Sequence, residues 1–184
     1  MLPLPTARET RREMRHWWYL LLLGAALAAV AVAAVATVSA APHVPDGTIV
    51  VKIFAPHGDP GPSCARVLPL ARTAQTPAVL TGAMRALLRG PTAAERSRGY
   101  GGWFSAKTAG MLRSVRVANR VAYVDFRDFS RVIPNASSSC GSALLLAQLD
   151  RTAKQFPTVR RTAYSFDGSA SAFYEWLQRS PPTR

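Results

Sequence analysis

The chain contains 184 residues, of which 23 are Lys or Arg and 10 are Asp or Glu, so its formal net charge is +13. Hydrophobic residues make up 48% and charged residues only 18%, which is enough apolar material for a core and excludes a disordered polycation. Lysine occurs only at Lys52, Lys107 and Lys154, and this dominance of arginine indicates a GC-rich bacterial genome.

The N-terminal part has the features of a membrane anchor. No charged side chain occurs from Trp17 to Ala41, and as a helix these 25 residues would be about 37 Å long, more than the ~30 Å hydrocarbon core of a bilayer. Arginines precede this run, and basic residues stay on the cytoplasmic side. We therefore predict a cytoplasmic basic segment at 1–16, a transmembrane anchor at 17–41, and an extracytoplasmic remainder in a single-pass protein of the cell membrane.

A cleaved signal peptide is the alternative to an anchor. The small residues Val38-Ser39-Ala40 or Ser39-Ala40-Ala41 would suit cleavage, although a signal peptide needs only about 7–15 apolar residues. Cleavage would make the protein secreted, whereas a retained helix would hold it at the membrane. No Cys follows these small residues, so lipoprotein processing is not expected.

The first elements after the membrane segment are strands. Residues 42–47 contain two prolines and a glycine and form a tether of at most about 20 Å. The β-branched and aromatic run at 48–54 predicts a strand that ends in a loop rich in Pro and Gly. A weaker apolar run at 65–71 predicts a second strand.

A helix is expected next, from Thr76 as N-cap to Gly90 and Pro91. Leu80, Ala83, Met84, Leu87 and Leu88 recur at helical spacing and predict its buried face. Thr92 and Glu95 have the spacing of a capping box, which predicts a short helical turn.

The rest of the chain alternates strands and helices. A hairpin is expected from 111–117 and 120–126 around Asn119, then a helix at 141–155, a strand at 159–166 and a short terminal helix. This order predicts an α+β domain at 48–178, a largely antiparallel sheet with two main helices packed on one face, followed by a tail at 179–184.

Several motifs in this region resemble the GerMN domain of sporulation and spore germination proteins. They are the run from Leu87 to Pro91, the strand that ends with Asp125, the segment Thr152 to Pro157, and the turn after Phe166. The family motif positions are Leu87, Leu88, Gly90, Pro91, Asp125, Thr152, Phe156, Pro157, Asp167 and Gly168.

The resemblance implies a compact, exported α+β module without a catalytic centre. In structural terms, Gly90 would provide a helix C-cap, Pro157 a helix stop and Gly168 a turn. Only one such domain is present, where some family members carry two. Sporulation itself does not follow from the motifs.

The residues offer little for catalysis. The nucleophile motifs of hydrolases, Gly-x-Ser-x-Gly and Ser-x-x-Lys, do not occur, so no enzyme activity is expected. His57 and Asp59 are close in sequence but are expected in a solvated loop. Asp125 and Asp128 are expected as turn and cap residues rather than as a paired acid and base. No metal cluster or cofactor motif is found, so neither is predicted.

Two cysteines, Cys64 and Cys140, fall in the exported part. Disulfides persist outside the cytoplasm, so these residues are predicted to form one, with two buried thiols as the alternative.

The positive charge suggests an anionic partner. Nucleic acid is not expected, because the arginines are dispersed and no nucleic-acid-binding motif accompanies them. Arginines do gather around the hairpin and beside the last strand, where they could face anionic lipid or wall polymer, or simply solvent. The arginines concerned are Arg113, Arg116, Arg120, Arg127, Arg131, Arg151, Arg160 and Arg161.

Three functions are therefore compared. The first is a non-catalytic, membrane-anchored interaction module of the cell envelope with an envelope protein as partner. The others are a secreted or envelope-bound ligand-binding protein and an enzyme that acts on the cell wall. Trp103, Phe104, Tyr174 and Trp176 are either anchors at a partner surface or parts of the core.

Overall fold

Two strands form the first sheet of the computed structural model, which describes residues 47–182 except 60 and 134. β1 (Thr48–Ala55) pairs with β2 (Leu68–Gln75) in antiparallel register, Ala55 opposite Leu68. Alternate residues of β1 face the core, as the period of two along a strand requires. β2 begins at Leu68, later than the predicted run at 65–71. Leu68 lies opposite Ala55, the last residue of β1, so the residues before Leu68 have no partner strand to pair with.

The second sheet has three strands, β3 (Leu112–Ala118), β4 (Val121–Phe126) and β5 (Arg161–Phe166). β3 and β4 form the predicted hairpin. Its turn residues Asn119 and Arg120 have φ values of 49° and 60°, the conformation that a two-residue hairpin turn needs.

The prediction of a single sheet is wrong, although the pairing is largely antiparallel as expected, in two of the three strand pairs. The chain forms two sheets, and β5 pairs with β4 in parallel. The helix α4 (Ser139–Lys154) connects β4 to β5 and returns the chain to the end of the sheet where β4 begins. This crossover makes the two strands parallel.

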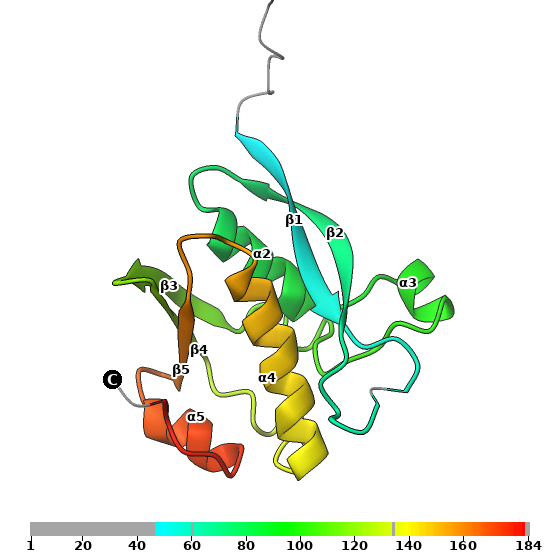
Figure 1. Cartoon of the computed structure of the whole chain (residues 1–184), viewed down its shortest axis with the longest axis vertical. Helices are drawn as coiled ribbons and strands as arrows, with labels where there is room; N and C mark the ends of the chain where they lie inside the picture. Colours follow the sequence, from blue (N-terminus) through cyan, green and yellow to red (C-terminus); the bar gives the residue numbers. More distant parts are fainter. Residues whose placement is uncertain (1–46, 60, 134, 183–184) are drawn as a thin grey trace, which may run out of the picture. The chain divides into compact units, whose positions relative to one another are not determined.

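The main helices contact both sheets rather than one face of one sheet. α2 (Val79–Arg89) packs on β1, β2 and β3, while α4 packs on α2, β1 and β5 (Figure 1). α2 begins later than predicted, with Ala78 as N-cap, because the Thr76 amide donates to the Gly47 carbonyl at 2.6 Å and extends the first sheet.

The two short helices agree with the predictions. In α3 (Ala93–Ser97) both hydrogen bonds of the capping box between Thr92 and Glu95 are present. α5 (Ala170–Trp176) follows the turn at Asp167 and Gly168, which have φ values of 47° and 87°.

Helix α4 covers the free edge of β1 with side chains. Gln155 exchanges two hydrogen bonds with the backbone of Lys52, at 2.8 and 2.7 Å. Thr152 accepts from the Phe54 amide at 3.2 Å, and Gln148 donates to the Phe54 carbonyl at 3.4 Å. An open strand edge invites pairing with another chain, and these contacts occupy this one. They also give the motif residue Thr152, fully buried, a structural role.

The four aromatic residues considered as partner anchors belong to the core. Phe104 and Tyr174 are 3% and 5% exposed, and Trp103 and Trp176 are half-buried against the main cluster. Trp103 also donates from its indole Nε1 to the Gly141 carbonyl at 3.1 Å. Of the two alternatives, the structure therefore favours parts of the core.

The predicted segments at 1–16 and 17–41 and nearly all of the tether lie outside the described residues. In the part that is described, no helix combines the length and apolar character needed to cross a bilayer.

Candidate functional site

Most of the predicted motif residues lie where α2 ends and where β4 and β5 end. Cys64 in the loop after β1 and Cys140 in the first turn of α4 form the predicted disulfide, with Cα atoms 5.1 Å apart. The bond fastens the loop between β1 and β2 to the beginning of α4.

The motif from Leu87 to Pro91 ends helix α2 and connects it to the core. Leu87 and Leu88 are buried, and so is Pro91. Gly90 has φ 72° and ψ −171°, and a side chain here would meet the Phe104 carbonyl oxygen at 2.1 Å. This glycine is needed for close backbone approach as well as for the turn.

An ion pair joins this turn to the first sheet. Arg72 on β2 donates to both carboxylate oxygens of Glu95, at 2.7 and 2.6 Å, and both side chains are largely buried. The hydrogen bonds from Arg72, with that from the Thr92 amide, lower the pKa of Glu95 from 4.5 to about 2 although burial opposes the change.

This shift predicts an acid-sensitive contribution to stability. Because the folded-state pKa is lowered, the contribution is complete above pH 4.5 and is lost as the pH falls through about 2. Its full size is about 3 kcal/mol at 1.36 kcal/mol per pH unit. We expect urea unfolding to show this loss in the wild type and a smaller one in Glu95→Gln. Asp59→Asn, which removes an exposed loop carboxylate, should retain the wild-type loss.

The motif residues Asp125, Asp167 and Gly168 meet where β4 and β5 end. Arg113 bridges the two carboxylates, at 3.3 Å to Asp125 and in closer contact with Asp167. Asp125 also accepts from Ser165 Oγ and the Gly168 amide, at 2.7 and 2.8 Å. The hydrogen bond from Arg113 lowers the pKa of Asp167. This network holds the turn closed.

The other acidic candidates also have local structural roles. Asp128 accepts from the Ser130 amide at 2.8 Å, and Asp59 accepts from the Gly61 amide at 2.9 Å. His57 contacts the Arg98 carbonyl at 2.7 Å through Nε2 and does not meet Asp59 in a hydrogen bond. Among the described residues, no group of three His, Cys, Asp or Glu side chains could hold a metal ion.

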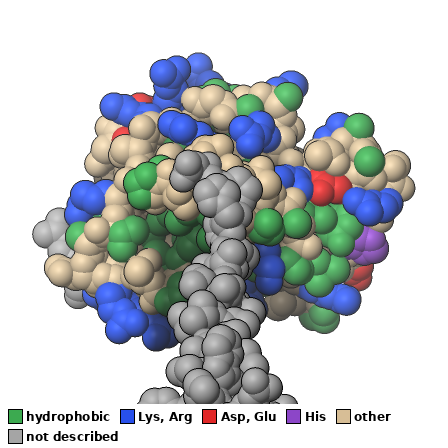
Figure 2. All heavy atoms as spheres, turned by 90° about the horizontal axis from the view of Figure 1, so that it is seen from above, with side chains coloured by type: hydrophobic (Ala, Val, Ile, Leu, Met, Phe, Trp, Pro, Cys, Tyr) green, Lys and Arg blue, Asp and Glu red, His purple; other side chains and the backbone are tan. Residues whose placement is uncertain are grey.

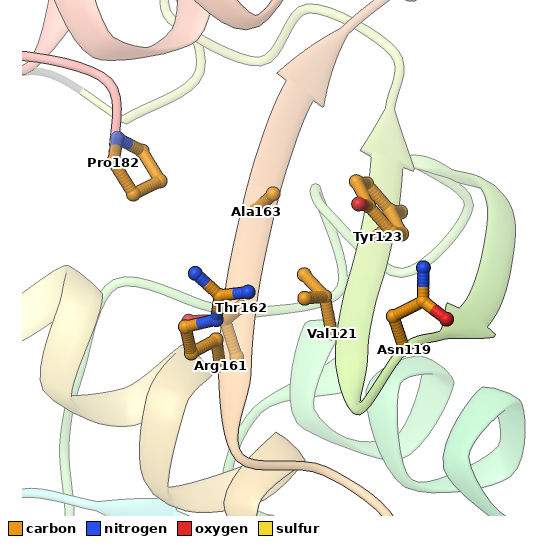
Figure 3. Close-up of a pocket in the computed structure, with 7 residues that line it drawn as sticks. All are labelled: Asn119, Val121, Tyr123, Arg161, Thr162, Ala163 and Pro182. Carbon is orange, nitrogen blue, oxygen red and sulfur yellow. The ribbon is translucent and has the colours of Figure 1, made fainter. Parts of the chain in front are cut away.

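A pocket of about 270 Å³ lies on the second sheet, at the end where β4 and β5 begin. Figure 3 shows Val121 and Tyr123 on β4, Asn119 in the hairpin turn, and Arg161 to Ala163 on β5, with Pro182 beyond β5. The lining combines one aromatic ring, one guanidinium and two small polar groups. It can therefore bind an anionic or a polar group beside an apolar one.

The sheet around this pocket is cationic and open. The Arg116 guanidinium lies 4.1 Å from the centre of the Tyr123 ring, and Tyr123 is 39% exposed. Its neighbours Ala122 and Val124 point to the opposite side and are buried. On that opposite side, which faces the interior, Phe173 of α5 packs against Phe126 and Tyr164. We call the surface formed by Arg116, Tyr123, Arg161 and Ala163 the open sheet face.

A second hollow on the other side of β5 contains two tyrosines. Asp150 accepts from Tyr164 Oη at 2.7 Å and from Thr162 Oγ1 at 2.8 Å, and pairs with Lys154 at 2.8 Å. Burial raises the pKa of Tyr174 to about 12, and burial with the charge of Asp150 raises that of Tyr164 well above its usual range. Both phenols therefore stay protonated. The Asp150 carboxylate is occupied by its contacts with Tyr164, Thr162 and Lys154.

The sequence patterns identified only part of the open sheet face. Arg116 and Arg161 were among the arginines expected near the hairpin and the last strand. Tyr123, Ala163 and Pro182 were not identified as site residues, because the parallel pairing of β4 and β5 that brings them together was not predicted. The alternation of Tyr123 with Ala122 and Val124 along the strand was the available signal.

Comparison with known proteins gives one family and one similar structure. The model of the family described as "Germane: Sporulation and spore germination" matches residues 53–171, more than half of the chain. A search of curated proteins finds no match. Among solved structures, a putative lipoprotein from Clostridium perfringens has a TM-score of 0.38 and 16% sequence identity, over 67% of this chain and 77% of that chain.

Proposed function

The chain belongs to the Germane family of sporulation and spore germination domains, and from this we propose that it is a non-catalytic, membrane-anchored interaction module of the bacterial cell envelope. We further propose that the open sheet face is its binding surface for an envelope protein. One observation carries this choice: Arg116 and Tyr123 stack on a sheet side where Tyr123 stays exposed.

The membrane anchor is supported by the sequence. The uncharged run 17–41 is long enough to span a bilayer, and the arginines before it favour a cytoplasmic N-terminus. The disulfide between Cys64 and Cys140 fits a domain outside the cytoplasm, where such bonds persist.

A binding role, rather than catalysis, is supported by the hydrogen bonds and ion pairs that four carboxylates make within the domain. Asp125 and Asp167 share Arg113, Asp150 is engaged by two hydroxyls and a lysine, and Glu95 pairs with Arg72. Acid-base catalysis needs a carboxyl group that is free to exchange protons with a substrate. These four are held in structural contacts instead.

The binding surface can be tested by photo-crosslinking in intact cells. A photoreactive phenylalanine analogue would replace Tyr123 on the open sheet face or, as a control, Lys107 on an exposed loop far from it. We expect a discrete crosslinked protein partner from position 123 only. Arg116→Gln with Arg161→Gln should reduce its yield about fivefold, since two exposed charges at roughly 0.5 kcal/mol each contribute about 1 kcal/mol together. Equal crosslinking from both positions would contradict this assignment.

The anchor can be tested separately by fractionation and N-terminal sequencing. We expect the native protein to stay with membranes after carbonate extraction and to keep residues 17–41. A mature N-terminus after Ala40 or Ala41 would instead favour the secreted ligand-binding protein.

A further inference from the structure

We propose that the end of the domain where the chain enters, here called the entry end, lies on the anionic lipid headgroups of the same membrane that anchors the protein. The proposal rests on the proposed membrane anchor and adds a specific orientation. The entry end consists of the segments 47–51, 73–81, 115–122 and 155–162.

Hydrogen bonds and a shared groove bring these four segments together. The Thr76 amide donates to the Gly47 carbonyl at 2.6 Å, and the amides of Arg160 and Arg161 donate to the Arg120 carbonyl at 2.8 and 3.1 Å. A groove of about 250 Å³ joins the beginning of α2, the end of β3 and the loop after α4. Its lining includes Pro77, Val79, Val117 and Phe156.

The entry end exposes apolar side chains. Four large hydrophobic residues of the described chain are exposed, and three of them, Ile49 (46%), Val50 (70%) and Val117 (43%), belong to this end. Ile49 lies on the same side of β1 as Val51, which packs in a small cluster with Val79 and Phe156. Ile49 and Val117 thus continue the apolar groove, whereas Val50 faces the other side of β1. This arrangement also gives the motif residue Phe156 a place in the groove.

The charge of the entry end is mainly positive. Its four segments contain no Asp or Glu, and they contain Arg120 and Arg160 besides Arg116 and Arg161 of the open sheet face. One carboxylate touches these segments, that of Asp150, which accepts from Thr162 Oγ1 and pairs with Lys154, both at 2.8 Å. The carboxylates of Asp125, Asp128 and Asp167 lie at the opposite ends of β4 and β5. Figure 2 views the domain from the entry end and shows hydrophobic side chains in a hollow with Lys and Arg side chains around its margin.

The occupant follows from where the chain enters. The tether of residues 42–47 spans at most about 20 Å, so a membrane that holds residues 17–41 must lie near Gly47. An apolar surface with a basic margin matches the interfacial region of a bilayer, where apolar groups enter the headgroup layer and Arg side chains meet lipid phosphates. The excess of positive charge at this end suits an anionic surface.

The test uses the full-length protein in vesicles of phosphatidylcholine, with or without phosphatidylglycerol. A spin label is attached at Val50→Cys at the entry end, or at Lys107→Cys on a loop that contacts the far end of α2 through Thr108. Its accessibility to dissolved oxygen and to a water-soluble nickel complex is then measured. We expect the label at position 50 to become shielded from nickel only with phosphatidylglycerol, and the label at 107 to stay accessible in both vesicles.

Charge variants sharpen the test. Each Arg near an anionic surface shifts binding about fivefold, so Arg120→Gln with Arg160→Gln should reduce the ratio of docked to undocked domain about 25-fold. Arg89→Gln with Arg98→Gln, which removes the same charge from exposed positions away from the entry end, should leave the ratio unchanged. Equal effects of both pairs would overturn the proposal.

Carbonate extraction of the same vesicles separates the two proposals. If the protein stays in the vesicles but position 50 is nickel-accessible with either lipid, the docking is wrong and the anchor stands. If shielding is equal in neutral vesicles, anionic lipid is not the occupant. Release of the protein by carbonate would overturn the anchor and the docking with it.

Discussion

Replacing Cys64 and Cys140 together with Ser is expected to lower the free energy of unfolding by about 4 to 5 kcal/mol. The two residues are 76 positions apart, and the crosslink removes the conformational entropy of this long loop from the unfolded chain. Most of the domain's elements, from β2 to β4, lie inside the loop. The loss is close to the total stability of many single domains, so the variant should be partly unfolded at 37 °C.

Urea unfolding of the double variant and of the wild type, with and without reductant, measures this effect. Reduction should lower the stability of the wild type by nearly the same amount and leave the variant unchanged. A difference below about 1 kcal/mol would show that the bond adds little constraint. Since the bond is expected to form only outside the cytoplasm, protein expressed in a reducing compartment should match the variant.

The substitution Gly90→Ala should destabilise the domain by about 4 kcal/mol. The backbone of Gly90, at φ 72° and ψ −171°, lies in a region that is essentially restricted to glycine. Other residues adopt this conformation at a cost of about 1 to 3 kcal/mol. The added methyl group would also lie 2.1 Å from the Phe104 carbonyl oxygen, so the backbone of one segment must move. Overpacking of this kind typically costs a further 1 to 3 kcal/mol.

Gly110→Ala is the matched control for this prediction. Gly110 does not have a positive φ, and a Cβ atom there would meet nothing within 4 Å. We expect its stability to change by no more than about 0.5 kcal/mol, in either direction. Similar melting temperatures for the two variants would contradict the role assigned to the close contact between Gly90 and Phe104.

Local patterns predicted most of the individual elements. The turn at Asn119 and Arg120, the capping box of Thr92 and Glu95, and the apolar stripe of α2 involve residues within a few positions of one another. Such interactions are encoded by adjacent side chains, so they can be read without the fold. The family resemblance was also present in the motifs and is confirmed by the match over residues 53–171.

Long-range pairing could not be predicted in the same way. The hydrogen bonds of Gln155, Thr152 and Gln148 to β1 join residues separated by 94 to 103 positions. Nothing near Thr152 indicates that its hydroxyl accepts from a strand edge. The parallel pairing of β5 with β4 likewise depends on the path of α4, which the spacing of its apolar residues does not specify.

The sequence alone therefore determined the family, the two cysteines that pair, most element positions and the charge of the chain, because each depends on composition or on neighbouring residues. Only the tertiary structure decided that there are two sheets, that Trp103, Phe104, Tyr174 and Trp176 pack in the core, and that the open sheet face and the entry end exist. These features require residues far apart in the chain to meet, and the free energy that brings them together comes from burial shared across the whole domain.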